Sequence, residues 1–332
     1  MLAVPITKNA LAESLPLKAI ELPCPNPGNG EVRIRVLACG VCHTDLHELE
    51  GDIALPRLPV IPGHQVIGVV DRLGEGITAP SCGTLVGVCW LAHTCGRCRF
   101  CLSGRENLCE SARFTGFHSD GGYAEFMTAN SGFIFPLPDS LDPVAAAPLL
   151  CAGVIGYRSL CQAQTRPGCR LGLYGFGSSA HICLQIARYW QCQTAVFTRS
   201  PLHRQEAVAL GADWTGSADD RPPWPLDSAV IFAPAGELVP KALSHLDRGG
   251  VLALAGIHMS TLPGFEYRLI YGERRLTSVT NCTRQDVADL LQLAAEIPLR
   301  TTVETFPLAA AGKALLALKQ SHLRAAAVLK VS

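Results

Sequence analysis

The amino-terminal third of the chain alternates polar and apolar residues over short stretches. Polar and apolar side chains take turns from Glu31 to Val36, and a second, largely apolar stretch runs from Val66 to Val70. Successive side chains of a strand point to opposite faces, so a period of two indicates strands with one buried face. Proline and glycine separate the stretches. This region is therefore expected to be mainly β, with loops between short strands.

The pattern changes from about residue 168 onward. Apolar stretches of strand length now alternate with helix-length segments that end in glycine. The expected strands lie in 171–177, 194–200, 229–236 and 251–257, and the expected helices in 181–190, 203–212 and 238–250. Strands separated by single helices pair in parallel through right-handed crossovers. The expected fold class is α/β, with a Rossmann-type doubly wound parallel sheet.

The carboxyl-terminal segment contains no further glycine-rich turn. Its pattern predicts a helix in 285–296, a strand in 301–308, another helix, and a last strand in 325–331. Because this segment has no strand followed by a glycine-rich turn, we do not expect it to extend the α/β domain. We expect it to return to the domain formed by the first third of the chain.

A chain of 332 residues is longer than a single hydrophobic core usually accommodates, so two domains are expected. We expect a mainly-β domain of residues 1–152 and 282–332, and an α/β domain of residues 153–281. The longest mainly apolar run, Val144 to Tyr157, is shorter than the roughly 20 residues of a membrane-spanning helix, and Pro148 interrupts it. No membrane segment is therefore expected.

Charge and cysteine usage narrow the range of partners. Lys plus Arg and Asp plus Glu each total 28, and no basic run offers a footprint for phosphates, so nucleic acid and anionic membranes are not expected as partners. The first 18 residues lack the basic start, apolar stretch and cleavage site of a secretory signal. Four of the 15 cysteines are clustered, which suits metal ligation in a reducing compartment better than a disulfide scaffold. We expect a cytoplasmic protein.

A glycine-rich turn follows the first strand of the α/β region. Residues 175–180 read Gly-Phe-Gly-Ser-Ser-Ala and match the pattern G-x-G-x-x-G/A between a strand and a helix. Such a turn lets the backbone approach a pyrophosphate at the helix amino terminus. An ordinary tight turn would explain the glycines alone, but the succession of strand-helix units favours dinucleotide binding. The candidate binding residues are Gly175, Gly177, Ser178 and Ser179.

The tip of the next strand bears on which dinucleotide binds. An NAD site places a carboxylate there for the adenosine ribose 2′-hydroxyl, whereas this strand ends Thr198-Arg199-Ser200. Hydroxyls and a guanidinium can bind a 2′-phosphate that a carboxylate would repel, so the tip favours NADP(H) over NAD(H), with His203 or Arg204 as additional donors. If Arg199 is only a solvated surface charge, either cofactor can bind.

Four cysteines lie close together in a single stretch, at Cys95, Cys98, Cys101 and Cys109. This spacing allows four thiolates to surround one zinc ion tetrahedrally, and such a closed site leaves no position for a substrate. Its expected role is therefore structural, holding its loop together. An iron–sulfur cluster is the main alternative, although the fourth cysteine comes late and no proline follows it. A redox thiol switch is the other alternative.

A second metal site cannot be chosen from spacing alone. A catalytic zinc needs three protein ligands and an open fourth position, and two cysteines with one histidine form one such set. The motifs GVCHTD, PGHQVIG, GGYAEF, PLLCAG and GFGSSA, the four-cysteine stretch and a helix ending ALGA occur in an order that resembles zinc-containing medium-chain alcohol dehydrogenases over essentially the whole chain. The resemblance implies Cys42, His64 and Cys151 as catalytic zinc ligands. It also implies two zinc ions per chain and a GroES-like fold for the mainly-β domain.

The resemblance further implies roles for the residues that follow Cys42. Thr44 would contact the alcohol oxygen, His47 would continue the proton path toward solvent, and Asp45 would orient the zinc-bound histidine. His43 stands where a basic residue contacts the cofactor pyrophosphate. Each residue alone has an ordinary alternative, since Thr44 can be a turn hydroxyl and the histidines can be surface residues.

Trp90 and Leu91 fall where the family lines its substrate cleft with apolar side chains. Two other positions depart from the family. Gln65 replaces the usual glutamate after the zinc-ligand histidine, which removes a negative charge behind the metal. Ala326 stands where many members place an arginine on the cofactor phosphates, with Arg324 as a nearby alternative. Neither departure removes a metal ligand, so both bear on rate and cofactor affinity.

Together these features predict an enzyme that transfers a hydride between a small alcohol or aldehyde and a nicotinamide cofactor, with NADP(H) favoured. A polyol or amino-alcohol dehydrogenase on the same scaffold is the near alternative. A non-catalytic zinc- and nucleotide-binding redox sensor is the distant one. Zinc-free quinone reductases share the fold but have no reason to carry either cysteine set. The family also implies a homodimer or homotetramer.

Overall fold

The computed structural model of the chain describes residues 1–138, 140–297, 299–320, 322–323 and 326–331. The chain forms two compact units. The first comprises Met1–Cys151 and Asn281–Ser332, and the second comprises Ala152–Thr280. Both terminal segments of the chain therefore belong to the first unit.

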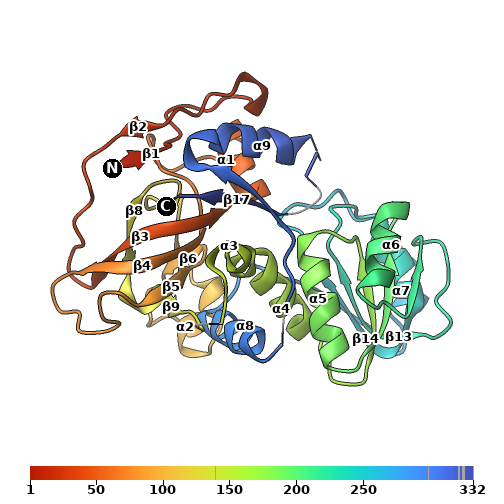
Figure 1. Cartoon of the computed structure of the whole chain (residues 1–332). Coiled ribbons are helices and arrows are strands. Elements are labelled where there is room, and N and C mark those ends of the chain that lie inside the picture. Colours follow the sequence, from red (N-terminus) through yellow and green to blue (C-terminus); the bar gives the residue numbers. More distant parts are fainter. Residues whose placement is uncertain (139, 298, 321, 324–325, 332) are drawn as a thin grey trace. The chain divides into compact units, whose positions relative to one another are not determined.

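A seven-stranded sheet forms the centre of the first unit (Figure 1). Its order is β16-β17-β3-β4-β5-β9, and β8 pairs with β3 beside this path. Its strands are β3 (Glu31–Gly40), β4 (Gln65–Leu73), β5 (Leu85–Val88), β8 (Phe126–Asn130), β9 (Ile134–Pro136), β16 (Val303–Pro307) and β17 (Ala326–Lys330). The dark blue β17 runs antiparallel beside β3, with Val328 opposite Gly40. The last strand of the chain thus extends the sheet built by the first third.

Strand β3 alternates buried and accessible positions as the sequence pattern predicts. Val32, Ile34 and Val36 are completely buried, whereas Arg35 is exposed. Their side chains belong to one apolar core together with Val66 of β4. Burial of a valine or isoleucine side chain contributes about 1.5–3 kcal/mol. The mainly-β character expected for this part of the chain is confirmed.

Short elements complete the first unit. The remaining strands are β1 (Leu2–Ala3), β2 (Ile20–Glu21), β6 (Leu91–His93) and β7 (Arg113–Phe114). The α-helices are α1 (His43–Glu50), α2 (Arg99–Leu102), α3 (Pro143–Ala146), α8 (Arg284–Glu296) and α9 (Ala311–Lys319). The 3-10 helices are η1 (Ala12–Ser14), η2 (Glu106–Leu108), η3 (Ser131–Phe133), η4 (Ala147–Leu150) and η6 (Leu308–Ala310).

The second unit is built on a six-stranded sheet of order β12-β11-β10-β13-β14-β15, in which every neighbouring pair is parallel. Its strands are β10 (Arg170–Tyr174), β11 (Gln193–Phe197), β12 (Trp214–Gly216), β13 (Leu226–Ile231), β14 (Leu246–Leu254) and β15 (Arg275–Ser278). Its helices are α4 (Ala152–Gln162), α5 (Ser178–Tyr189), α6 (Pro201–Ala209), α7 (Leu238–His245) and the 3-10 helix η5 (Tyr267–Leu269). The α/β fold class with a Rossmann-type sheet is confirmed.

The sheet of the second unit differs from the expectation in its edges. Strands β12 and β15 were not predicted, because β12 has only three residues and β15 reads Arg-Leu-Thr-Ser, so neither forms an apolar run. The helix expected over 238–250 ends at His245. Leu246 already belongs to β14 and pairs with Leu226, so β14 begins earlier than the pattern indicated.

Among the described helices, no single one is long and apolar enough to cross a membrane. The segments Pro143–Leu150 and Ala152–Gln162 reach that length and composition only when they are counted together, and they are bent relative to each other. The long apolar run of the sequence lies here. Ala147, Leu150 and Val154 within it are buried in the protein, which accounts for their apolar character.

Candidate active site and metal centres

Cys42 lies at the N-cap of helix α1, and Asp45 fixes its backbone. Oδ2 of Asp45 accepts a 2.9 Å hydrogen bond from the Cys42 N–H, and the Cys42 side chain takes part in the reciprocal capping interaction. A carboxylate in the first turn also suits the positive end of the helix dipole. The thiol of Cys42 is therefore presented at the start of the helix.

The buried Asp45 carboxylate connects three further groups. Its Oδ1 accepts a 3.1 Å hydrogen bond from the Gly63 N–H and lies 3.3 Å from Nδ1 of His64. Its Oδ2 accepts a 3.3 Å bond from the Tyr123 hydroxyl. Gly63 has a φ of +99°, and a Cβ there would lie 2.4 Å from the Tyr123 ring. Only glycine fits this turn, which holds His64 beside Asp45.

The structure brings Cys42, His64 and Cys151 together. One potential ligand atom from each residue lies within 4.8 Å of the others. The two sulfurs are 3.8 Å apart, which matches two thiolates that each lie about 2.3 Å from a tetrahedral zinc. The neighbouring Cys151 thiol lowers the pKa of Cys42 and so favours the thiolate. The donor set fits a zinc ion with one position left for a substrate.

Thr44, His47 and His43 follow Cys42 on helix α1. Thr44 is buried, and its Oγ1 lies 3.7 Å from Sγ of Cys42. His47 is half-buried, with Nδ1 2.8 Å from Oδ2 of the exposed Asp52. His43 is exposed. The hydroxyl thus lies next to Cys42, one of the three candidate ligands, whereas His47 reaches a surface carboxylate.

Trp90 and Leu91, the two predicted cleft residues, lie in different surroundings. The Trp90 ring stacks on Phe114 at a centroid distance of 4.3 Å and lies 6.2 Å from the His64 ring. Its Nε1 is buried and has no hydrogen-bond partner among the described residues. Leu91 is 1% exposed and forms part of the core. Trp90 is therefore the member of the pair that lies near the candidate ligands.

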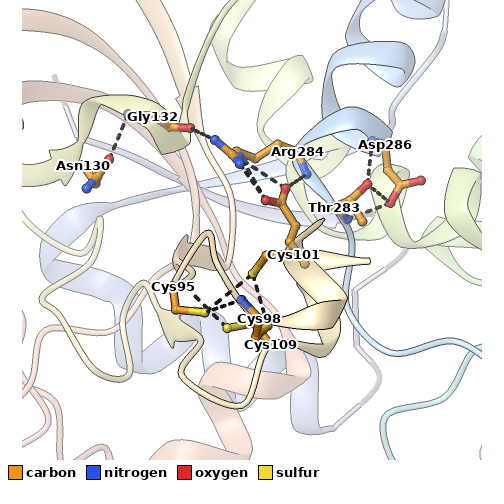
Figure 2. A network of polar contacts seen from close by, with 10 residues as sticks. Cys95, Cys98, Cys101, Cys109, Asn130, Gly132, Thr283, Arg284 and Asp286 are labelled. Atoms are coloured by element: carbon orange, nitrogen blue, oxygen red, sulfur yellow. Dashed lines mark hydrogen bonds and ion pairs between the residues drawn. The ribbon is translucent and has the colours of Figure 1, made fainter. Parts of the chain in front are cut away.

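The four cysteines of the predicted structural site also lie together, with their sulfur atoms within 4.8 Å of one another (Figure 2). The Cys98 and Cys101 sulfurs are 3.5 Å apart, and the Cys95 and Cys101 sulfurs are 3.9 Å apart. The Cys98 N–H donates to Sγ of Cys95, and the Cys95 N–H donates to Sγ of Cys109, both at 3.4 Å. Backbone N–H groups lower the pKa of Cys95 to about 6. Such N–H donors stabilise thiolates, and this chemistry fits one tetrahedral metal ion.

Three residues near the first site escaped the sequence analysis. Tyr123 donates to Asp45, and Asp52 contacts His47, as described above. Glu48 is completely buried, and neither of its carboxylate oxygens has a hydrogen-bond partner among the described residues. Burial and the negative charge of Asp45 raise the pKa of Glu48 to about 9. An isolated glutamate on a helix carries no pattern that could have indicated this position.

The glycine-rich turn in the second unit connects β10 to α5. Gly175 has a φ of +87°, and a Cβ there would lie 3.0 Å from the backbone nitrogen of Ala233. Gly177 is the N-cap of α5, and a Cβ there would meet nothing within 4 Å. Ser178 is exposed and Ser179 is half-buried at the start of the helix. The turn thus leaves the amino terminus of α5 accessible, as an anion site requires.

The residues that follow β11, at its tip, include two hydroxyls that already accept hydrogen bonds from nearby backbone N–H groups. Oγ1 of Thr198 accepts from the Ser200 N–H at 3.3 Å, and Oγ of Ser200 caps helix α6 by accepting from the His203 N–H at 3.3 Å. Arg204 donates from Nε to the Thr198 carbonyl at 2.9 Å. Arg199 is exposed. The guanidinium of Arg199 is therefore the group of this tip that is freest to meet a ligand.

The two positions that depart from the family lie in the first unit. Gln65 begins β4, is 4% exposed, and faces Gly40, where a Cβ would lie 2.7 Å from Oε1 of Gln65. Ala326 begins β17. Arg324 lies outside the described residues.

Comparisons with known proteins agree with this geometry. The family model of the alcohol dehydrogenase GroES-like domain matches residues 28–139. A probable alcohol dehydrogenase, AdhA, of Mycobacterium tuberculosis is 46% identical over 95% of this chain and 93% of its own. An alcohol dehydrogenase of Geobacillus stearothermophilus is 34% identical over 95% of this chain and 96% of its own.

Solved structures agree as well. A cinnamyl alcohol dehydrogenase of Sorghum bicolor superposes with a TM-score of 0.89 at 29% identity, over 99% of this chain and 97% of its own. A structure described as an NAD-dependent alcohol dehydrogenase gives a TM-score of 0.87 at 26% identity, over all of both chains. The chain therefore belongs to the zinc-containing medium-chain alcohol dehydrogenase family, whose members are oxidoreductases that act on small alcohols or aldehydes with a nicotinamide cofactor.

Proposed function

We propose that this alcohol dehydrogenase depends on zinc, binds two zinc ions per chain and prefers NADP(H) to NAD(H). The observation that carries the proposal is the convergence of Cys42, His64 and Cys151 beside the buried Asp45. Two thiolates and one imidazole leave a bound zinc formally neutral with an open position, which is the arrangement of a catalytic rather than a structural site.

The residues around this site have complementary roles in the proposed reaction. When bound, zinc supplies a Lewis acid for the substrate oxygen, and nicotinamide gives or accepts the hydride. Asp45 holds the Nδ1 side of the His64 ring, so Nε2 is the nitrogen available for coordination. The buried Thr44 hydroxyl accepts a hydrogen bond from the alcohol and passes the released proton on toward His47. His47, paired with the exposed Asp52, moves protons between this interior and solvent.

The second unit is proposed to bind the dinucleotide. Gly175, Gly177, Ser178 and Ser179 leave the amino terminus of α5 open to a pyrophosphate. His43 is proposed as a basic contact to the same pyrophosphate. The strand tip Thr198-Arg199-Ser200 offers a free guanidinium and no carboxylate, which supports NADP(H).

Two remaining parts of the proposal concern the rest of the first unit and assembly. Cys95, Cys98, Cys101 and Cys109 would hold a structural zinc. Trp90 would supply apolar surface toward the substrate, and the buried Leu91 would support the cleft from the core. A homodimer or homotetramer is proposed from the family relationship, and light scattering of the purified protein tests it.

Metal analysis combined with activity tests the zinc assignment. Wild-type protein should contain two zinc ions per chain and reduce small aldehydes. Cys42→Ser should retain one zinc and lose turnover. Cys98→Ser should also retain one zinc, but its main defect should be a lower unfolding free energy rather than lost turnover. Full activity in metal-free protein, or in Cys42→Ser, would refute the catalytic role of this set.

A panel of alcohols and aldehydes with both cofactors tests the rest. We expect kcat/KM for NADPH to exceed that for NADH at least tenfold, about 1.4 kcal/mol, and Arg199→Ala to reduce this ratio. A wild-type preference for NADH would show that the tip of β11 does not select the 2′-phosphate. Activity only on sorbitol or threonine would instead favour the polyol or amino-alcohol alternative.

A further inference from the structure

Two cysteines outside both metal-ligand sets lie side by side in the second unit. Sγ of Cys169 is 3.7 Å from Sγ of Cys192. Each cysteine immediately precedes a strand, Cys169 before β10 and Cys192 before β11. Neither belongs to a group of three or more His, Cys, Asp or Glu side chains that could hold a metal among the described residues. Metal ligation therefore does not account for the pair.

The backbone holds the two cysteines at a separation that suits a disulfide. Their following residues, Arg170 and Gln193, are paired neighbours of adjacent parallel strands. The Gln193 N–H donates to the Cys169 carbonyl at 2.9 Å, which continues the pairing to the cysteines themselves. Neighbouring strands lie about 4.8 Å apart, and disulfides join Cα atoms about 4.4–6.8 Å apart. Side-chain rotation can therefore bring the two sulfurs into bonding distance.

The two thiols differ in environment. Cys169 is half-buried and can be reached from solvent, and its Sγ also lies 3.7 Å from Oγ of Ser228. Cys192 is only 6% exposed, and its Sγ lies 3.4 Å from the Arg166 carbonyl oxygen, an acceptor for its proton. The contact with Cys192 lowers the pKa of Cys169 to about 6, and the same contact raises the pKa of Cys192. An accessible thiolate next to a protonated, sheltered thiol is the arrangement of an attacking and a resolving cysteine.

We propose that Cys169 and Cys192 form a redox-active dithiol that hydroperoxides convert to a disulfide. The Cys169 thiolate attacks the peroxide, the O–O bond breaks, and a sulfenic acid forms as alkoxide or hydroxide leaves and takes a proton from solvent. The Cys192 sulfur then attacks the sulfenic sulfur, the S–S bond forms, the S–O bond breaks, and water leaves with the Cys192 proton. In sum, two thiols lose two electrons and the peroxide accepts them.

The disulfide would close a loop that contains β10, the glycine-rich turn and α5. That segment carries Gly175 and Gly177, the candidate pyrophosphate contacts. Oxidation would thus link the two ends of the strand-helix unit in which the cofactor is proposed to bind. The chemistry of the dithiol itself does not depend on that proposed function.

Peptide mapping of the zinc-loaded protein tests the proposal. The protein is treated with hydrogen peroxide near neutral pH, free thiols are alkylated, and a non-reducing digest is analysed by mass spectrometry. We expect a linked peptide pair containing Cys169 and Cys192, a mass loss of two hydrogens, and reversal by dithiothreitol. Cys192→Ser should instead leave a sulfenic acid on Cys169 that dimedone traps.

Matched variants separate a specific site from general thiol oxidation. Cys161 is exposed in the same unit, so Cys161→Ser should leave the link intact, whereas Cys169→Ser should abolish it. Cys89 and Cys282 also neighbour each other but are 1% and 2% exposed. If peroxide links only those two or the metal-ligand cysteines, while Cys169 and Cys192 alkylate fully, the proposed dithiol is wrong.

Discussion

Arg284 and Glu106 form a bidentate ion pair that joins the start of helix α8 to the four-cysteine loop. Nη2 of Arg284 lies 2.7 Å from Oε2 of Glu106, and the Arg284 backbone N–H donates to Oε1 at 2.9 Å. The guanidinium also lies 4.7 Å above the ring centre of Phe133. Glu106 lies between Cys101 and Cys109, so this pair fixes the loop from outside the proposed metal site.

Replacement of Glu106 by glutamine should loosen that loop. The amide keeps the shape but removes the charge-assisted bonds, and we expect a loss of about 1–2 kcal/mol in unfolding free energy, because the arginine is partly solvated. Zinc should also leave the four-cysteine site faster in a chelator. Glu266→Gln, which breaks the fully exposed pair with Arg268, is the control and should change neither quantity. Equal zinc release from both variants would show that the ion pair does not hold the loop.

Replacement of Gly63 by alanine should disturb the site through His64. The new Cβ would clash with Tyr123 and Cys39 as well as strain a positive φ, so we expect roughly 2–5 kcal/mol of destabilisation and loss of one zinc. Gly83 also has a positive φ, of +90°, but nothing lies near its Cβ position. Gly83→Ala should therefore cost only the backbone strain, about 1–2 kcal/mol, and keep both zinc ions. Urea unfolding and metal analysis of the two variants distinguish clash from strain.

The fold was predictable where the pattern is long and local. Alternating apolar stretches and helices indicated the parallel sheet, because each strand of its centre is buried on both faces. Its edges were not indicated, since β12 and β15 are short and half-exposed, and pairing with a neighbour rather than residue type makes them strands. The end of α7 was misplaced because Leu246 follows Ala242 and Leu243 at helical spacing, although β14 already begins at Leu246.

The candidate sites divide in the same way. Cys95 to Cys109 are close in sequence, so spacing alone indicated a metal site. The set of Cys42, His64 and Cys151 is assembled by folding, and only the resemblance to a family could suggest it. Contacts such as Arg284 with Glu106 join residues 178 positions apart, and no local pattern encodes them. The buried Glu48 likewise has no counterpart in any periodicity.

A stability change below neutral pH is expected from His245. Burial lowers the pKa of this histidine below its ordinary value of 6.5, with the charge of Arg221 acting in the same direction. The unfolded chain then binds a proton more readily than the folded one. The stability that the neutral His245 contributes is therefore fully present above about pH 6.5 and is lost as the pH falls through the folded pKa. Nδ1 lies 2.8 Å from the buried Tyr174 hydroxyl, and asparagine can keep a polar atom there. His245→Asn should therefore lose less stability than wild type between pH 7.5 and 5.5 in urea titrations. If wild type and His245→Asn lost the same unfolding free energy between pH 7.5 and 5.5, His245 would not be the group responsible.

Asp45 should control metal affinity at the proposed catalytic site without being a ligand. Its two oxygens accept from Cys42, Gly63 and Tyr123 and contact His64, and asparagine can satisfy only part of this set. Loss of the carboxylate that orients a ligating histidine typically weakens metal binding by about 10–100-fold. Competition with a chelator should therefore release one zinc from Asp45→Asn early, while the zinc of the four-cysteine loop serves as an internal reference. Tyr123→Phe removes one donor and leaves the charge, so a smaller shift is expected. If Asp45→Asn released both ions together, or neither early, the carboxylate would be acting on the fold as a whole rather than on His64.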